Sequence, residues 1–237
     1  IIRERIKNDQ FEYSIYGVSY SDATGDQRFR AGSELDDTGM EKARERIESD
    51  FDLLTFLSEP IEASSRINDP RNYGMEEWRD IFTPRQLVVH YEYLQAFRHF
   101  VPEIQAEYDD QMSDAILTVL TFVTSRAVDL NTRLTQWYAN KGTGSRMFAE
   151  NNYALKRMFV DNNLAAPRRG FVKASEHVIE SYESLASYNT YAKAEHTSQD
   201  AATLSEQWEN NSIDVAVVDP PYYGSIHYAE LSDIFYV

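Results

Sequence analysis

A short segment late in the printed sequence has the residue types of a catalytic loop. An apolar, mostly β-branched run at 213–218 leads directly into what we name the DPPY loop (Asp219, Pro220, Pro221 and Tyr222). Two consecutive prolines lack amide donors, so they cannot extend a central strand and instead make a stiff turn. Carboxylate and carbonyl oxygens beside an aromatic ring suit one task. The oxygens accept hydrogen bonds from an exocyclic amine, and the ring stacks on the planar base that carries it.

The segment that positions this loop is predicted to be a buried strand. Residues 213–218 form a short apolar run, as expected of a strand covered on both faces of a parallel sheet. In open α/β sheets, ligands bind beyond the carboxyl ends of such strands, which is where the loop lies. We therefore predict an α/β fold, in which the carboxyl-terminal part of a Rossmann-like sheet follows a large, mainly helical region and an N-terminal β-hairpin.

The chain divides by pattern into three regions. Residues 1–80 are predicted to hold a hairpin, a charged helix and an irregular connector, over 11–30, 37–56 and 58–77. Residues 81–187 are predicted to be helical, and residues 188–237 hold the DPPY loop. Within these two regions we expect a helix from 83 to about 100 that Pro102 breaks or restarts, helices over 113–138, 149–160 and 171–187, and a strand over 187–195.

One helix start is well marked. In the TPRQ segment (Thr83, Pro84, Arg85 and Gln86), threonine can cap the helix, proline suits its first turn, and glutamine completes a capping box. The first reading of Arg85 is therefore as part of a helix start. An alternative is that Arg85 meets a phosphate or orders a catalytic loop.

Charge and composition limit the classes of protein. The 237 residues carry 23 Lys and Arg against 39 Asp and Glu, a formal charge of −16, and only six of the cations are lysine. Such a surface is typical of a protein in concentrated salt, with an ordinary acidic protein as the alternative. It also disfavours general phosphate binding. There is no cysteine, so a thiolate zinc site and a cysteine nucleophile are excluded from this stretch.

Other classes are excluded by what the sequence lacks. The five histidines have no metal-ligand spacing, and we expect no metal site. No apolar run approaches the roughly 20 residues that cross a bilayer, so we expect a soluble, cytoplasmic chain with no membrane partner.

Four segments together resemble a known family. They are WRDIFTPRQL at 78–87, NTRL at 131–134, DPPYY at 219–223 and YAELSD at 228–233. DPPYY contains the DPPY motif, which is typical of amino-methyltransferases that modify adenine N6 or cytosine N4 in DNA. The other three segments accompany it. The whole set resembles a family of large adenine-specific DNA methylases that carry a zinc-ribbon insertion. The resemblance implies transfer of a methyl group from S-adenosylmethionine to DNA, and an aspartate at position 219 favours adenine.

The resemblance also implies roles for single residues. Asp219 and the carbonyl of Pro220 would hold the target amine, and Tyr222 would stack on a base rotated out of the duplex. The same comparison implies further contacts, with Pro221 stiffening the loop, Tyr223 and His227 lining the base pocket, and Asp200 and Ala201 facing the adenine of the cofactor. Arg85, Asn131 and Arg133 fall in matched segments. They are candidates either for support of the active site or, in the case of Asn131 and Arg133, for a solvated helix face.

Two parts of the family pattern are not in the chain. These are the Gly-rich cofactor loop that follows the first strand of the sheet, and the cysteines of the zinc ribbon. We therefore interpret the chain as a piece of a longer polypeptide that binds the cofactor weakly without the remainder of the parent chain. Position in the chain further suggests that residues 30–180 read the DNA target.

Two alternatives stay open. One is a non-catalytic recognition subunit of a DNA modification or defence complex such as a restriction–modification system. The other is an amino-methyltransferase that acts on RNA or on protein.

Overall fold

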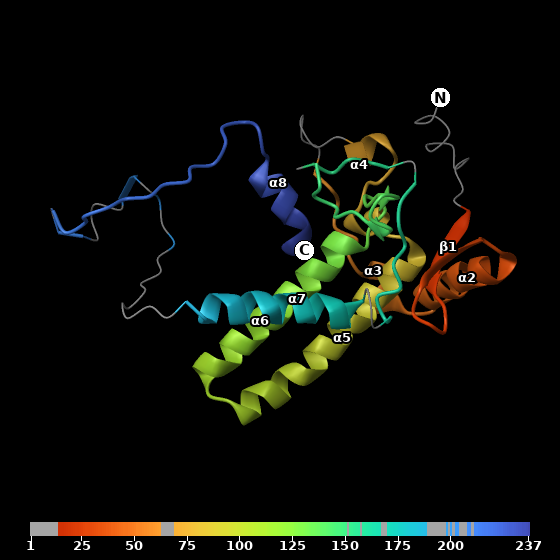
Figure 1. Cartoon of the computed structure of the whole chain (residues 1–237), viewed down its shortest axis with the longest axis horizontal. Helices are drawn as coiled ribbons and strands as arrows, with labels where there is room; N and C mark the ends of the chain where they lie inside the picture. The colour runs from red at the N-terminus through yellow and green to blue at the C-terminus, as the bar shows by residue number, and fades with distance from the viewer. Residues whose placement is uncertain are drawn as a thin grey trace.

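The computed structural model describes residues 14–62, 69–150, 152–156, 158–166, 170–188, 198, 200, 202, 203, 208, 209 and 211–237. Helices account for about half of these residues, and two small antiparallel sheets of two strands each complete an α/β fold (Figure 1). Neither sheet is Rossmann-like.

The predicted N-terminal hairpin is present in the described part of 11–30. Strand β1 (Gly17–Ser21) pairs antiparallel with β2 (Gln27–Ala31), with Ser19 opposite Phe29. The turn is organised by the Asp22 carboxylate, which accepts hydrogen bonds from the amides of Thr24 and Asp26. The Thr24 hydroxyl and the Arg28 guanidinium lower the pKa of Asp22 to about 2.

The charged helix predicted over 37–56 is two helices. Helix α2 (Glu34–Glu48) starts at a capping box, and α3 (Phe51–Thr55) begins anew after Asp50. The side chain of Asp50 accepts hydrogen bonds from two amides of α3, at 3.1 and 3.2 Å. A local carboxylate cap therefore divides an apolar stripe that reads as continuous in sequence. The connector that follows contains short α4 (Asp69–Asn72), then η1 (Trp78–Ile81).

The TPRQ segment starts helix α5 (Pro84–Glu107) as predicted. The Thr83 hydroxyl accepts from the amide of Gln86, and the Gln86 side chain accepts from the amide of Thr83. The expected break at Pro102 is wrong, because α5 continues through it to Glu107. A missing amide costs one hydrogen bond, and here α5 packs against both α2 and α6.

Helix α6 (Asp110–Leu130) ends eight residues before the predicted position 138. Asn131 leaves helical geometry with φ −142° and ψ 67°, because its side chain and carbonyl bond to neighbouring segments. The next residues form β3 (Trp137–Tyr138), paired with β4 (Thr143–Gly144) around Gly142 at φ +59°. Figure 1 shows α5 and α6 as a helical hairpin that projects from the rest of the chain.

The helix predicted over 149–160 is absent from its described residues, which are irregular. The helix predicted over 171–187 is confirmed as α7 (Phe171–Ala186), which packs against α6. Of the strand predicted over 187–195, residues 189–195 lie outside the described part, and Ser187 and Tyr188 simply follow α7.

The buried strand predicted over 213–218 is not formed. These residues are extended coil, and Val215, Val217 and Val218 are 76, 91 and 81% exposed. A strand needs neighbours for its backbone hydrogen bonds, and the described residues place none beside this segment. The chain then forms short α8 (Tyr228–Ser232) and η3 (Asp233–Phe235).

One apolar core collects residues from most of these elements. Its members come from α2 and α3, the connector and η1, α5, the segments after α6, and η3, as in Ile47, Leu53, Ile61, Met75, Trp78, Ile81, Phe82, Leu87, Tyr91, Leu134, Met147, Tyr153 and Ile234. The division at 80 and 187 stays a prediction. In the described part of the chain no helix is long and apolar enough to cross a membrane.

Candidate functional site

The DPPY loop lies on the outside of the molecule. Its residues are exposed, with Tyr222 60% exposed and the adjacent Tyr223 fully so. A turn closes directly behind the loop, where the amide of Ser225 donates to the carbonyl of Tyr222 at 3.1 Å and Gly224 takes φ +69°. An L side chain would be strained at that φ, so glycine suits the position. Carboxylate, carbonyl and ring are thus all open to a substrate.

The chain after the loop is anchored. His227 is the residue preceding α8, and its partly buried side chain makes no capping hydrogen bond. Four residues further on, the carbonyl of Leu231 accepts a hydrogen bond from the Tyr153 hydroxyl at 2.8 Å. Ile234 is 6% exposed, and Phe235 lies 5.8 Å from Phe148 between ring centres. The loop is therefore exposed at its own residues and fixed to the core downstream.

Of the two cofactor residues implied by the family resemblance, Asp200 is described and its contacts are local. Asp200 is exposed, and its carboxylate accepts the amide of Ala202 at 2.9 Å, which closes a local turn. Ala201 lies outside the described residues. An adenine subsite needs an enclosed, largely apolar wall, and no described contact joins Asp200 to the DPPY loop. The residues present do not by themselves fit S-adenosylmethionine.

Arg85 belongs to a partly buried ion pair. Its Nε and Nη2 atoms donate to the same oxygen of Asp161, at 3.1 and 2.8 Å. The hydroxyl of Thr83 also approaches that oxygen, at 3.2 Å. The side chain of Arg85 is 31% exposed and that of Asp161 17%. This pair ties the start of α5 to the irregular segment around position 160.

Gln86 and Asn131 continue the network into the interior. Both are 1% exposed. The Asn131 Oδ1 atom accepts from Gln86 Nε2 at 3.2 Å and from the amide of Asn162 at 2.8 Å. Gln86 Nε2 also donates to the carbonyl of Val160 at 3.2 Å. The solvated-face interpretation of Asn131 is therefore wrong, because this side chain is an internal connector.

Arg133 has a similar connecting position. Its amide donates to the carbonyl of Ile81 at 2.8 Å, and Nη1 donates to the carbonyl of Asp80 at 2.7 Å. These bonds hold the chain after α6 to η1. Arg85, Asn131 and Arg133 thus lie in the segments around η1 and the start of α5, and no described hydrogen bond or ion pair joins them to the DPPY loop.

His90 lies beside this network and is uncharged near neutral pH. It is 5% exposed, with Nε2 3.3 Å from the carbonyl of Asn131. Burial lowers the pKa of His90 to about 4. Its Nδ1 atom and the Nδ2 atom of Asn131 have no hydrogen-bond partner among the described residues. Across all the residues that the structure describes, no group of three or more His, Asp or Glu residues could hold a metal ion.

Several of the described arginines are engaged in ion pairs. Arg28 pairs with Asp22, Arg30 with Asp36, Arg44 with Glu41, Arg46 with Asp50 and Glu92, and Arg126 with Asp129. Phosphate binding needs cations that are free to meet it. The surface charge of the described residues offers no support for the expectation that residues 30–180 read DNA.

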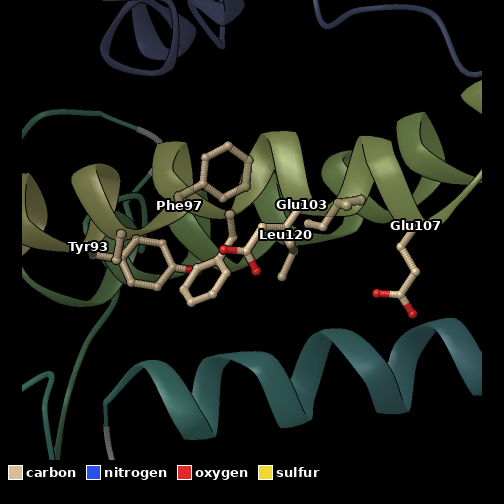
Figure 2. Close-up of a pocket in the computed structure, with 8 residues that line it drawn as sticks. Tyr93, Phe97, Glu103, Glu107 and Leu120 are labelled. Carbon is tan, nitrogen blue, oxygen red and sulfur yellow. The ribbon is translucent and has the colours of Figure 1, made fainter.

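A trough runs along one face of α5 (Figure 2). It has a volume of about 390 Å³ and is lined from α5 and α6 by Tyr93, Ala96, Phe97, Phe100, Glu103, Ile104, Glu107 and Leu120. Its α5 residues recur at three- and four-residue spacing, so they share one helix face. The trough includes no residue that the sequence analysis placed in a site.

Sequence reasoning missed Asp161, Asn162 and Tyr153, the residues that join distant segments. A polar run, Asp161-Asn162-Asn163, directly after apolar Phe159 and Val160 was the available signal for the first two. Nothing in the sequence singles out Tyr153 among 16 tyrosines. No family model, no curated protein and no solved structure matches the chain.

Proposed function

We propose that the chain is part of an S-adenosylmethionine-dependent DNA methyltransferase that methylates an exocyclic amine, adenine N6 in the first instance. The cofactor supplies the reactive methyl group. The chain's own contribution is the DPPY loop. The Asp219 carboxylate and the carbonyl of Pro220 accept hydrogen bonds from the two N–H groups of the amine, which directs the nitrogen lone pair outward. Tyr222 stacks on the rotated base.

One observation carries this proposal. The loop that offers these groups is exposed and preceded by an exposed run of β-branched residues, including Val215, Val217 and Val218. Such residues gain about 25 cal/mol for each Å² of apolar surface that is buried. They are suited to a strand between two others in a parallel sheet. A Rossmann-like sheet, completed by other sequence of the parent protein, would bury them and place the loop at its carboxyl edge.

The test is methyl transfer from radiolabelled S-adenosylmethionine by the full-length parent protein, with DNA, RNA and protein offered separately. Label in DNA that Asp219→Ala abolishes supports the proposal. Asp214→Ala is the matched control, because Asp214 is an exposed aspartate of the same segment. We expect it to retain most of the activity. A salt series in the same assay tests whether activity is highest in concentrated salt.

Other outcomes select the alternatives. Label in RNA alone, or in protein alone, would mean that this is the substrate of the methyltransferase instead of DNA. No label in any acceptor, from folded protein that binds the cofactor, would favour a recognition subunit of a modification or defence complex.

A further inference from the structure

The hydroxyl of Tyr153 occupies an unusual place at the end of α8. Tyr153 lies in an irregular segment, is 2% exposed, and its ring packs edge-on against Trp78 with 5.7 Å between ring centres. The hydroxyl donates to the carbonyl of Leu231 at 2.8 Å. This hydrogen bond bridges the irregular segment and the end of α8, next to η3.

This bridge is the first long-range tie after the DPPY loop. Within 211–226 the described backbone hydrogen bonds are local, as from Ser225 to Tyr222. At 228–235 the side chain of Ile234 enters the apolar core and that of Leu231 packs against it. Tyr222 is nine residues from Leu231, with a turn and one short helix between them. The position of the loop relative to the core is therefore set where Tyr153 holds this helix.

The bond is built to persist. Burial, with the nearby Asp233 charge, raises the pKa of Tyr153 far above its ordinary value. The hydroxyl therefore keeps its proton at neutral pH and remains a donor to Leu231. A hydrogen bond from a largely buried donor is stronger than the same bond in water.

We propose that Tyr153 is a positioning residue, whose hydroxyl latches residues 228–235 to the helical core and so fixes the DPPY loop for reaction. This role rests on the function proposed above. It assigns the alignment of the loop to a side chain 66 residues upstream of Asp219. Tyr153 touches no substrate. Its effect passes through the backbone of α8.

Tyr153→Phe in the full-length parent isolates the hydroxyl, because the ring and its packing on Trp78 remain. Tyr91→Phe is the matched control, since Tyr91 is a buried tyrosine of the same core. Hydrogen–deuterium exchange of peptides covering 219–237 reads the latch directly. We expect faster exchange there in Tyr153→Phe, with core peptides unchanged, and no change in Tyr91→Phe.

Steady-state methyl transfer reads the consequence. A misplaced reacting group lowers the chemical step more than binding, so we expect kcat to fall by roughly ten-fold while the KM for S-adenosylmethionine stays within two-fold. Unchanged exchange in Tyr153→Phe overturns the latch. Faster exchange with wild-type kcat in an active enzyme overturns the positioning role. If the wild-type protein transfers no methyl group, the proposed function is wrong, whatever the result for Tyr153→Phe. The positioning role then fails with it, while the exchange result still decides whether the hydroxyl holds α8.

Discussion

The region around the start of α5 and the segment that carries the DPPY loop use polar groups in opposite ways. Around Gln86 and Asn131, side chains are 1% exposed and bond to one another and to the backbone. Around Asp219, carboxylate, carbonyls and rings face outward, and the apolar residues before them do too. The segments that carry the resemblance proposed from the sequence thus fall into two kinds. One kind holds the molecule together, and the other has its chemistry available for a partner.

The largest expected contrast is in packing. Leu53→Ala removes a side chain with no exposed surface, so we expect a loss of about 2–5 kcal/mol in the free energy of unfolding. Val217→Ala changes a residue that is 91% exposed and should cost less than about 0.5 kcal/mol. Urea unfolding of this chain measures both. If Val217→Ala lowered the free energy of unfolding nearly as much as Leu53→Ala, residues 213–218 would be packed. The contrast between this segment and the core would then be wrong.

The pH dependence of stability sharpens the same comparison. The folded pKa of His90 is about 4, below its ordinary 6.5, so the unfolded chain takes up a proton first. Its neutral form supports folding fully above pH 6.5. That support is lost as pH falls from 6.5 towards 4, by up to about 3 kcal/mol.

The measurement is the free energy of unfolding from pH 7.5 to 4.5 in wild type and in His90→Phe, where the wild-type slope should be the steeper. His99→Phe serves as the control, because the side chain of His99 is 74% exposed. Equal slopes in wild type and His90→Phe would show that His90 is not buried in its neutral form.

Breaking the buried hydrogen-bond network of Gln86 and Asn131 should cost less free energy of unfolding than the loss of up to about 3 kcal/mol expected for His90. Asn131→Ala removes one of the two acceptors of Gln86 Nε2 and the acceptor of the Asn162 amide, so we expect a loss of about 2 kcal/mol. Asp200→Ala removes an exposed turn aspartate and should change stability by less than about 0.5 kcal/mol. Thermal or urea unfolding compares the two. Equal costs would mean that burial at Asn131 does not carry the energy assigned to it.

The smallest effect separates support of the fold from support of catalysis. Arg85→Ala removes a partly exposed pair with Asp161 and should cost about 1 kcal/mol. Arg44→Ala, on the exposed face of α2, controls for loss of an arginine. In the parent protein, methyl transfer per folded molecule should be unchanged in both. If Arg85→Ala lowered kcat without lowering stability, and Arg44→Ala did not, Arg85 would support catalysis and not only the fold.

Local signals in the sequence predicted local structure well. The TPRQ segment starts α5 because its capping bonds join residues only three apart. The turn of the hairpin is also closed locally, by hydrogen bonds from the amides of Thr24 and Asp26 to the Asp22 carboxylate. The end of α6 could not be predicted, since Asn131 leaves the helix to meet Asn162, a residue 31 positions away.

The candidate site divides along the same line. The DPPY loop was found from adjacent residues, whereas the partner of Arg85 is 76 positions distant and had no periodic signal. The strand over 213–218 is a further case. Its apolar, β-branched pattern predicts a strand that forms when other strands lie on either side of it. Among the described residues, no strand pairs with it.

The exposed valines before the DPPY loop have a consequence for handling the chain in solution. A short stretch rich in β-branched residues, with backbone groups that pair with no strand among the described residues, is a template for pairing with a second molecule. A formal charge of −16 opposes such association by mutual repulsion. That repulsion reaches about 10 Å at 0.1 M salt and only about 3 Å at 1 M. Added salt should therefore drive this chain towards edge-to-edge aggregates.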